Sequence, residues 1–325
     1  MLWFGCLLLL LMDLAMASKG GGVTVAHAVL RDVGSVKRGC SPRPLPAGTV
    51  SKNVTCRGCG CLASLQGDVS RRPPYFVPKR ARCEVRHWDG AAAAGCLRGK
   101  RVFIIGNSIA RGFFFEALAV YGGKGATAAS RDDQKATCSK KSIGYDASCS
   151  ARIAEADIQF KWFETLSHVV PGVPAEDSCY VKGKTRDCVV RMLNTSVPGD
   201  LFIFFLGMHL AYHWDDALAH MPVQDYRAYI RSSAQEWVET VRQAWHGHPA
   251  DVFRPRITPA QRPWGPRVPA VNTLLDEAFE NTGWSVVDSW GMNKGSEKKY
   301  YADGLHFPGP LSRAFWNVVL TSFCG

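Results

Sequence analysis

The chain has 325 residues, of which 46% are hydrophobic and 21% are charged, and this is the composition of an ordinary globular protein. That length suffices for one large domain or two smaller ones, each with a buried core. The formal net charge is +11, which favours anionic partners. The sequence contains no zinc-finger, helix–turn–helix or aromatic RNA-binding motif, so a nucleic-acid partner is not expected. Either a plain solvated basic surface or an acidic polysaccharide partner accounts for the charge.

The N-terminal residues, "MLWFGCLLLLLMDLAMASKG", determine the expected compartment. Residues 2–12 are apolar without interruption, and Ala15, Met16 and Ala17 form an A-x-A cleavage pattern. The apolar run is shorter than the roughly 20 residues that a membrane-spanning helix needs. We therefore predict a signal peptide over residues 1–17, no stable membrane span, and a location in the secretory pathway, either secreted or in the Golgi lumen. An uncleaved Golgi-type anchor is the alternative.

The chain contains 12 cysteines, and one of them, Cys6, lies in the predicted signal peptide. In an oxidising compartment the other cysteines predict about five disulfides and one odd thiol. Cys324 has no cysteine near it in the sequence, so we expect it to bond to the cysteine-rich residues 18–96. Two local pairs are plausible because their loops are short, namely Cys138–Cys149 and Cys179–Cys188.

Other motifs bear on modification and metal binding. Asn53 and Asn194 each begin an N-glycosylation sequon, which agrees with the secretory route. The run "CRGCGC" has cysteines at a spacing that zinc sites use, but no second Cys-x-x-Cys or His pair follows at ligand spacing. No metal and no other cofactor is predicted.

The order of the predicted elements indicates the fold. Residues 18–96 form a disulfide-rich, loop-rich N-terminal segment, and residues 97–325 form the main domain. Residues 101–105 are a short apolar strand, Gly106 and Asn107 make a tight turn, and residues 109–121 are a helix. Further strands are predicted at residues 158–163, 201–206, 251–257 and 284–287, and further helices at residues 226–245, 271–279 and 311–323. This alternation predicts an α/β fold of the flavodoxin-like type, in which a parallel sheet lies between two layers of helices.

Three candidate catalytic residues follow predicted strands or lie in the loop before the last helix. Ser108 stands where a strand gives way to a helix, and "YYADGLHFPG" places Asp303 three residues before His306. Ligands of parallel α/β sheets bind beyond the carboxyl ends of the strands, so these residues and Gly207 are expected to converge there. A serine hydroxyl needs a general base, which His306 can supply and Asp303 can orient. Taken singly, an N-cap serine and a loop histidine are the commoner explanations.

Two sequence blocks resemble one enzyme superfamily. The segment "CLRGKRVFIIGNSIAR" together with "DGLH" resembles the SGNH (GDSL-type) hydrolases. It is most similar to the PC-esterase branch, which includes trichome-birefringence-like polysaccharide O-acetyltransferases and sialate O-acetyltransferases. The resemblance covers about residue 82 to the C-terminus, and in the middle it consists only of the strand–helix order. It implies the SGNH type of three-layer fold.

The resemblance also implies roles for individual residues. Ser108 corresponds to the nucleophile, His306 to its base and Asp303 to the residue that orients the base. Gly207 corresponds to an oxyanion donor, and His209 stands where many members of the superfamily have asparagine, although an imidazole N–H can still donate. No clear counterpart of the second-block glycine is found. Arg111, one helical turn after Ser108, is either an orienting group for an anionic substrate or a surface arginine.

The resemblance implies an acyl-enzyme, most simply an acetyl-enzyme, whose acyl group passes to water or to a sugar hydroxyl. We therefore expect an O-acyl transferase or esterase whose substrate is a carbohydrate or glycoconjugate, acidic ones included; the acyl donor is not evident from the sequence. The alternative is a catalytically degenerate, glycan-binding protein with the same fold. It is favoured by Asn107, because an aspartate usually precedes the nucleophile, and by His209 in place of the usual asparagine. The intact Ser108, Asp303 and His306 favour the enzyme.

Overall fold

The computed structural model describes residues 65–68, 75–78, 85–121, 148–153, 155–163, 184–293, 301, 303–307 and 309–324. They all belong to one compact unit, residues 39–325. The predicted signal peptide, most of the cysteine-rich segment and Asn53 lie outside these residues, so the predicted domain boundaries remain predictions. Among the described residues, no helix combines the length and the hydropathy that a membrane span requires.

The centre of the fold is a six-stranded sheet in the order β4-β5-β3-β6-β7-β8. Five strands run parallel, as predicted: β3 (Arg101–Gly106), β5 (Ala156–Trp162), β6 (Leu201–Phe204), β7 (Val252–Pro255) and β8 (Ser285–Val287). The sixth strand, β4 (Ser148–Ile153), was not predicted and pairs antiparallel with β5 at one edge. Strands β3 and β6 are almost entirely buried, which explains their continuous apolar sequences.

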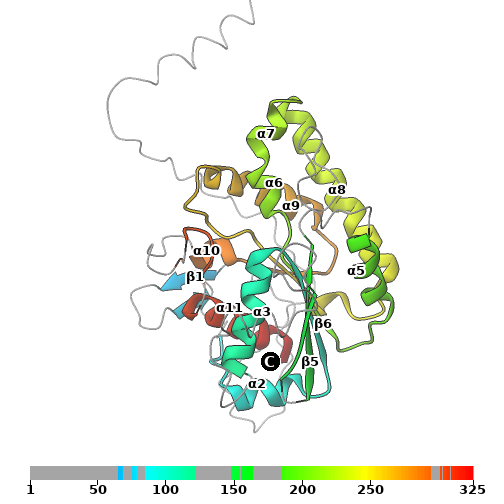
Figure 1. Ribbon diagram of the computed structural model, residues 1–325, viewed down its shortest axis with the longest axis vertical. Coiled ribbons are helices and arrows are strands. Elements are labelled where there is room, and N and C mark those ends of the chain that lie inside the picture. Colours follow the sequence, from blue (N-terminus) through cyan, green and yellow to red (C-terminus); the bar gives the residue numbers. More distant parts are fainter. Residues whose placement is uncertain are drawn as a thin grey trace, which may run out of the picture. The chain divides into compact units, whose positions relative to one another are not determined.

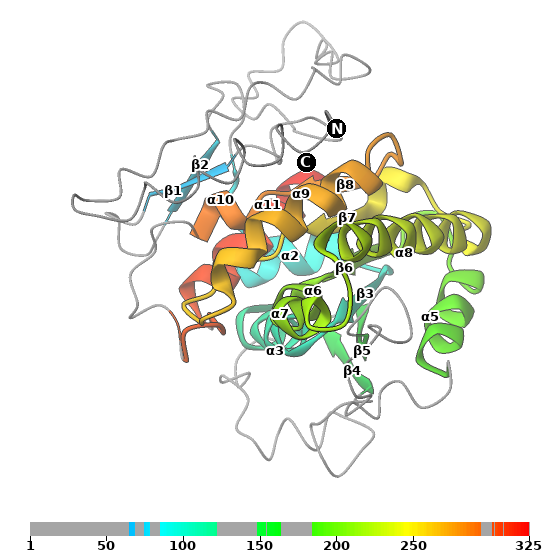
Figure 2. The same ribbon diagram turned by 90° about the horizontal axis from the view of Figure 1, so that it is seen from above.

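Helices cover both faces of this sheet (Figures 1 and 2). One layer contains α2 (Gly90–Leu97), α3 (Ser108–Tyr121) and α11 (Pro310–Cys324), which pack on one another. The other layer contains α5 (Lys184–Asn194), α8 (Val223–Ala244) and α9 (Val268–Ala278). The predicted helices at 109–121, 226–245, 271–279 and 311–323 are confirmed as α3, α8, α9 and α11, with ends shifted by a few residues. The fold is therefore the predicted flavodoxin-like three-layer α/β arrangement.

Short elements complete the domain. The helices α6 (Met208–Tyr212) and α7 (Trp214–Leu218) follow β6 and lie beyond the carboxyl end of the sheet (Figure 1). The five-residue helix α10 (Ser289–Asn293) follows β8, and β1 (Leu65–Asp68) contacts it while pairing antiparallel with β2 (Tyr75–Pro78). None of these elements was predicted, because each is too short to show a periodic pattern.

Helix α11 is fastened to α2 and α3 by packing, hydrogen bonds and a disulfide. The Trp316 ring stacks on Phe113 with centroids 4.2 Å apart, and its Nε1–H donates to the Phe113 carbonyl oxygen at 3.0 Å. The predicted link from Cys324 to the cysteine-rich segment is confirmed, because Cys324 is bonded to Cys96, the last cysteine of that segment. Cys149 is also in a disulfide, but the proposed partner Cys138 and the pair Cys179–Cys188 are not among the described side chains.

Candidate active site

The turn that carries Ser108 is built into the core of the sheet. Gly106 ends β3 at a φ of 153°, and a Cβ at this position would lie 2.6 Å from the Cβ of Phe205, so only glycine fits. Asn107 is 2% exposed, and its Oδ1 accepts a hydrogen bond from the Ile109 backbone N–H at 3.0 Å. This bond holds the tight turn, so an amide serves here in place of the usual carboxylate. Ser108 then begins α3 and is half-buried.

Asp303 organises its own loop by local hydrogen bonds. Its Oδ1 accepts from the backbone N–H groups of Leu305 at 3.1 Å and His306 at 3.0 Å, and its Oδ2 lies 2.9 Å from Nδ1 of His306. Partial burial raises the pKa of Asp303, but the backbone and ring hydrogen bonds from His306 outweigh it and lower the pKa from 3.8 to about 2. The three-residue spacing thus lets one carboxylate fix both the turn and the ring, and the carboxylate stays ionised at neutral pH.

The structure brings Ser108, His306 and Asp303 together although 198 residues separate the serine from the histidine. The Nε2 of His306 lies 2.8 Å from Oγ of Ser108, on the opposite side of the ring from Asp303. Because the ionised carboxylate only accepts hydrogen bonds, Nδ1 must carry a proton, and in the neutral imidazole Nε2 is then the acceptor. The serine hydroxyl therefore donates to His306, which is the arrangement that general-base activation of a serine requires.

Other residues attach the Asp303–His306 loop to the rest of the domain, and the sequence analysis found none of them. The Gln261 N–H donates to the Gly304 carbonyl oxygen at 2.7 Å, and a guanidinium nitrogen of Arg262 lies 3.5 Å from Oδ2 of Asp303. Past the histidine, Oε2 of Glu116 on α3 accepts from the Gly309 N–H at 3.1 Å. Each is a single contact between distant segments, so no local sequence pattern could have revealed it.

Gly207 and Ser108 follow the same end of the sheet because the strands that precede them are paired in register. Ile105 of β3 is opposite Phe204 of β6, and Ser108 and Gly207 each follow three residues later. Gly207 has a φ of 90°, which favours glycine, and a Cβ there would lie 2.5 Å from Cδ1 of Leu275, so that side chain would have to shift. Within the described part of the chain, the backbone N–H groups of Ser108 and Gly207 donate to no protein acceptor.

The other two predicted substrate-binding residues lie at the same edge of the sheet. His209 is in α6, two residues after Gly207, with its ring 5.9 Å from those of Tyr212 and His213. The guanidinium of Arg111 lies 5.4 Å above the ring of Trp162, the last residue of β5, so this arginine makes a cation–π contact. Both side chains are thus held by aromatic neighbours, and their contribution to substrate binding remains a prediction.

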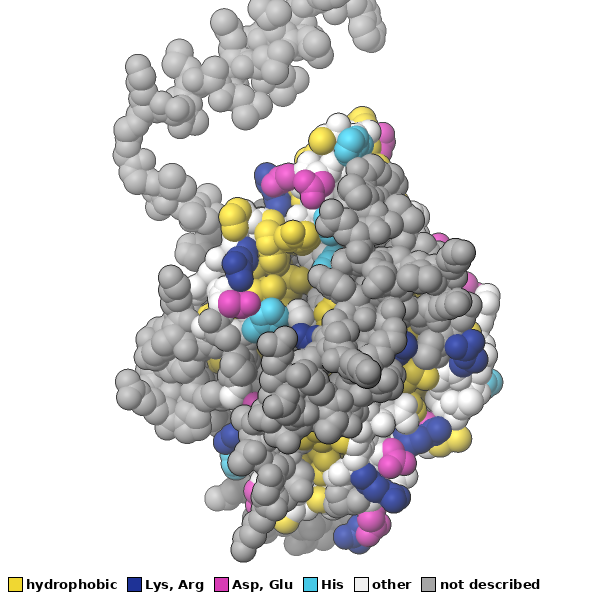
Figure 3. Space-filling model, viewed as in Figure 1, with side chains coloured by type: hydrophobic (Ala, Val, Ile, Leu, Met, Phe, Trp, Pro, Cys, Tyr) yellow, Lys and Arg dark blue, Asp and Glu magenta, His cyan; other side chains and the backbone are white. Residues whose placement is uncertain are grey.

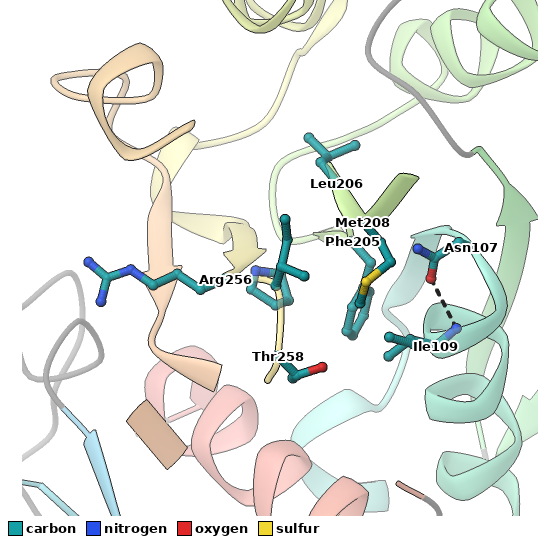
Figure 4. Close-up of a pocket in the computed structure, with 9 residues that line it drawn as sticks. Asn107, Ile109, Phe205, Leu206, Met208, Arg256 and Thr258 are labelled. Atoms are coloured by element: carbon teal, nitrogen blue, oxygen red, sulfur yellow. Dashed lines mark hydrogen bonds between the residues drawn. The ribbon is translucent and has the colours of Figure 1, made fainter. Parts of the chain in front are cut away.

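A small hollow opens next to the Ser108 turn, between the ends of β3, β6 and β7 (Figure 4). It is lined mainly by apolar side chains, including Ile109 and Met208, together with the polar side chains of Asn107 and Thr258. Thr258 is 3% exposed, and its hydroxyl has no hydrogen-bond partner among the described residues. The Arg256 side chain points away from the hollow in Figure 4, towards an ion pair with Asp288 at 3.0 Å. The hollow is therefore mostly apolar and uncharged.

The sequon at Asn194 is the only predicted glycosylation site among the described residues. Asn194 is exposed at the C-terminal end of α5, while Ser196, the third residue of the sequon, is 5% exposed. The acceptor side chain therefore faces solvent in the folded chain, and its modification remains a prediction.

Comparison with known proteins yields only distant likenesses. No family model and no curated protein matches the chain. Among solved structures, a lipase/acylhydrolase from Enterococcus faecalis matches with 12% identity and a TM-score of 0.38, over 68% of this chain and 93% of the other. The acetylxylan esterase Axe2 from Geobacillus stearothermophilus matches with 13% identity and a TM-score of 0.38, over 70% and 95% of the two chains. The fold described above rests on the topology of this chain itself.

Proposed function

We propose that the chain is a serine-dependent O-acyl esterase or acyltransferase of the SGNH type, with acetyl as the acyl group and a carbohydrate or glycoconjugate as substrate. The observation that supports this most is the hydrogen-bonded series from Ser108 Oγ through both ring nitrogens of His306 to Asp303. The carbohydrate substrate is supported by the sequence resemblance to polysaccharide O-acetyltransferases.

The geometry supports a two-step acyl transfer. As Oγ of Ser108 attacks the ester carbonyl carbon, its proton passes to Nε2 of His306, and Asp303 stabilises the imidazolium that forms. The tetrahedral intermediate collapses, the bond from carbon to the leaving alkoxide breaks, and His306 returns the proton to that oxygen. Water or a sugar hydroxyl then attacks the acyl-serine in the same way, which releases Ser108 and regenerates neutral His306.

The negative charge on the carbonyl oxygen needs donors that are in place before the reaction. The backbone N–H groups of Ser108 and Gly207 are the donors that we propose, because both residues follow paired strands at equivalent positions and both groups donate to no protein acceptor among the described residues. His209 is proposed as a third donor. Whether the acyl group reaches water or a sugar depends on which nucleophile enters the site, so the two activities share one mechanism.

The decisive experiment compares Ser108→Ala, His306→Ala and the double variant with the wild-type protein on an aryl acetate. Because the base and the nucleophile act in one step, all three variants should lose roughly 10⁴-fold or more in kcat, and the double should be no worse than either single. A fluorophosphonate modifies an activated serine, and both the wild type and His306→Ala retain Ser108. The difference between their labelling rates therefore reports the activation of Ser108 by His306.

Matched controls are the exposed residues Ser150 and His87, whose alanine variants should keep wild-type turnover. Circular dichroism establishes that each variant is folded. A folded Ser108→Ala protein with wild-type turnover would contradict the acyl-enzyme mechanism, and the glycan-binding alternative would replace it.

A further inference from the structure

Tyr212 is an unusually exposed aromatic side chain close to the candidate active site. It is 52% exposed, which is more than any other phenylalanine, tyrosine or tryptophan whose side chain the structure describes. It is the last residue of α6, the short helix that begins directly after Gly207. At about 1.5 Å per helical residue, the backbone of Tyr212 lies roughly 7–8 Å along the helix from Gly207.

The Tyr212 ring is held in place by other rings. Trp264 is half-buried and meets it edge to face, with centroids 6.0 Å apart and an interplanar angle of 89°. His213 meets it at 4.6 Å and 77°, and its Nδ1 lies 3.4 Å from Oδ2 of Asp216. An exposed ring with such neighbours needs little further ordering when a ligand contacts it, which favours binding.

Each member of this aromatic pair belongs to a segment that adjoins a different part of the candidate site. Tyr212 follows Gly207 along α6, which places it on the Ser108 side. Trp264 lies in the segment whose Gln261 donates to Gly304 and whose Arg262 contacts Asp303, which places it on the His306 side. The pair Tyr212–Trp264 therefore joins the two halves of the site at its outer rim.

The surface at the rim combines apolar and charged groups. In Figure 3 a patch of hydrophobic side chains lies between basic, acidic and histidine side chains on one face of the molecule. The charged groups beside the aromatic pair include Arg262, which is 43% exposed, and Arg267, which lies 3.0 Å from Oδ1 of Asp215. A sugar ring has apolar C–H faces and a circumference of hydroxyls, so it needs this combination of aromatic surface and polar rim.

We propose that Tyr212, braced by Trp264, is the stacking subsite for the pyranose ring that carries the ester or accepts the acyl group. This inference rests on the proposed function, since it assigns the substrate's sugar to a specific surface beside Ser108. The ring on Tyr212 would place a substituent oxygen towards Ser108, with charged side chains of the rim available to the remaining hydroxyls.

The test uses a ratio of two activities in the full-length protein. We would measure kcat/KM for O-acetylated xylo-oligosaccharides and for ethyl acetate, an ester without any ring, by proton release. Tyr212→Ala should lower the ratio of sugar ester to ethyl acetate by about tenfold, mainly through KM. Tyr212→Phe should preserve the ratio because it keeps the ring. Val197→Ala is the matched control, since Val197 is also 52% exposed and lies in the turn after α5.

A second readout separates this inference from the proposed function. Titration of the O-acetylated oligosaccharide into Ser108→Ala, followed by NMR, measures binding without turnover, and adding Tyr212→Ala should weaken it about tenfold. If Ser108→Ala keeps turnover while Tyr212→Ala still weakens binding, the mechanism fails and the subsite stands. If Tyr212→Ala changes neither the ratio nor the binding, or lowers both activities equally, the subsite is overturned.

Discussion

The two halves of the candidate site are built in different ways. The nucleophile half is part of the core, since Asn107 and Ile109, on either side of Ser108, are only 2% and 7% exposed. In the base half, the side chains of Asp303 and His306 are 43% and 34% exposed. The first half is positioned by a sheet and a helix, and the second by two buried flanking rings and a few polar contacts.

This difference determines how each half should respond to change. The sheet and α3 hold Ser108 through many buried contacts, so its position should depend less on any one polar group than the base half does. The buried rings of Tyr301 and Phe307 flank the loop, but the catalytic pair between them is partly exposed. The geometry of that pair therefore depends on identifiable polar contacts, such as those made by Glu116, Gln261 and Arg262. Substitutions in each half test whether this contrast is real.

Asp303→Asn should produce the largest effect of the five changes considered, because an amide donor facing Nδ1 selects the wrong tautomer of His306. We expect kcat on an aryl acetate to fall by about 10²–10⁴-fold, less than for Ser108→Ala. Since the folded-state pKa of Asp303 is lowered from 3.8 to about 2, its contribution to stability is present above pH 3.8 and is lost as the pH falls towards 2.

Urea unfolding of the wild type and Asp303→Asn over this pH range measures that contribution. The stability difference between the two proteins should shrink between pH 4 and 2. A difference that stayed constant over this interval would contradict the role of the ionised carboxylate in organising the loop.

Cys324→Ser should destabilise the domain by about 2–5 kcal/mol, because the Cys96–Cys324 disulfide closes a loop with a sequence separation of 228 residues. The bond joins the ends of α2 and α11, and α11 follows directly after the loop that carries His306. Thermal unfolding with and without reductant measures the effect. Cys96→Ser should match it, and the double variant should be no less stable than either single; additive losses would mean that each cysteine has a separate role.

Gly207→Ala tests the nucleophile half. The new Cβ would meet Leu275 at 2.5 Å in addition to the strain of a φ of 90°, so we expect a loss of roughly 2–3 kcal/mol and a displaced backbone N–H. Gly199→Ala is a close control, because Gly199 has a φ of 95° but nothing within 4 Å of the added Cβ. In chemical denaturation and in kcat, Gly207→Ala should lose more than Gly199→Ala. Equal losses would show that backbone strain alone matters at Gly207.

Asn107→Asp should change turnover by less than about tenfold, or ~1.4 kcal/mol in the barrier. An aspartate oxygen can accept the Ile109 N–H in place of the amide oxygen, so the turn is expected to persist. Asn107→Ala removes the acceptor and should lower turnover by more than Asn107→Asp does. A gain of a hundredfold or more in Asn107→Asp would instead identify the natural protein as an impaired enzyme.

Glu116→Gln should have the smallest effect, since an amide oxygen can still accept the Gly309 N–H. Burial raises the pKa of Glu116 above 4.5, although the Gly309 hydrogen bond and Arg313 oppose it. Because this pKa is raised, protonated Glu116 contributes to the stability of the folded protein below pH 4.5. The contribution is lost as the pH rises through the pKa that Glu116 has in the folded protein. The stability of the wild type relative to Glu116→Gln should therefore fall, by about 1 kcal/mol or less, between pH 4 and 7. Denaturation at both pH values measures the trend; a rise would contradict it.

The sequence alone was sufficient for the main elements of the fold and for the identity of the candidate catalytic residues. The runs at 101–105 and 201–206 are continuously apolar because β3 and β6 are buried on both faces, and burial of that kind leaves a local signal. By contrast, β4 reads "SCSARI", in which small and polar residues obscure any strand pattern, so this edge strand and its antiparallel direction could not be predicted. The five-residue helix α6 is too short for helical periodicity.

Only the tertiary structure decided which of the candidate residues meet. Ser108 and His306 are 198 residues apart, and their contact exists because β3 lies near the middle of the sheet and α11 packs on α3. No sequence pattern predicts the other contacts either. These are the contacts of Gln261, Arg262 and Glu116 with the base loop and the pairing of Tyr212 with Trp264. Local patterns report burial over a few neighbouring residues, whereas a hydrogen bond between distant segments depends on distances that only the packed chain sets.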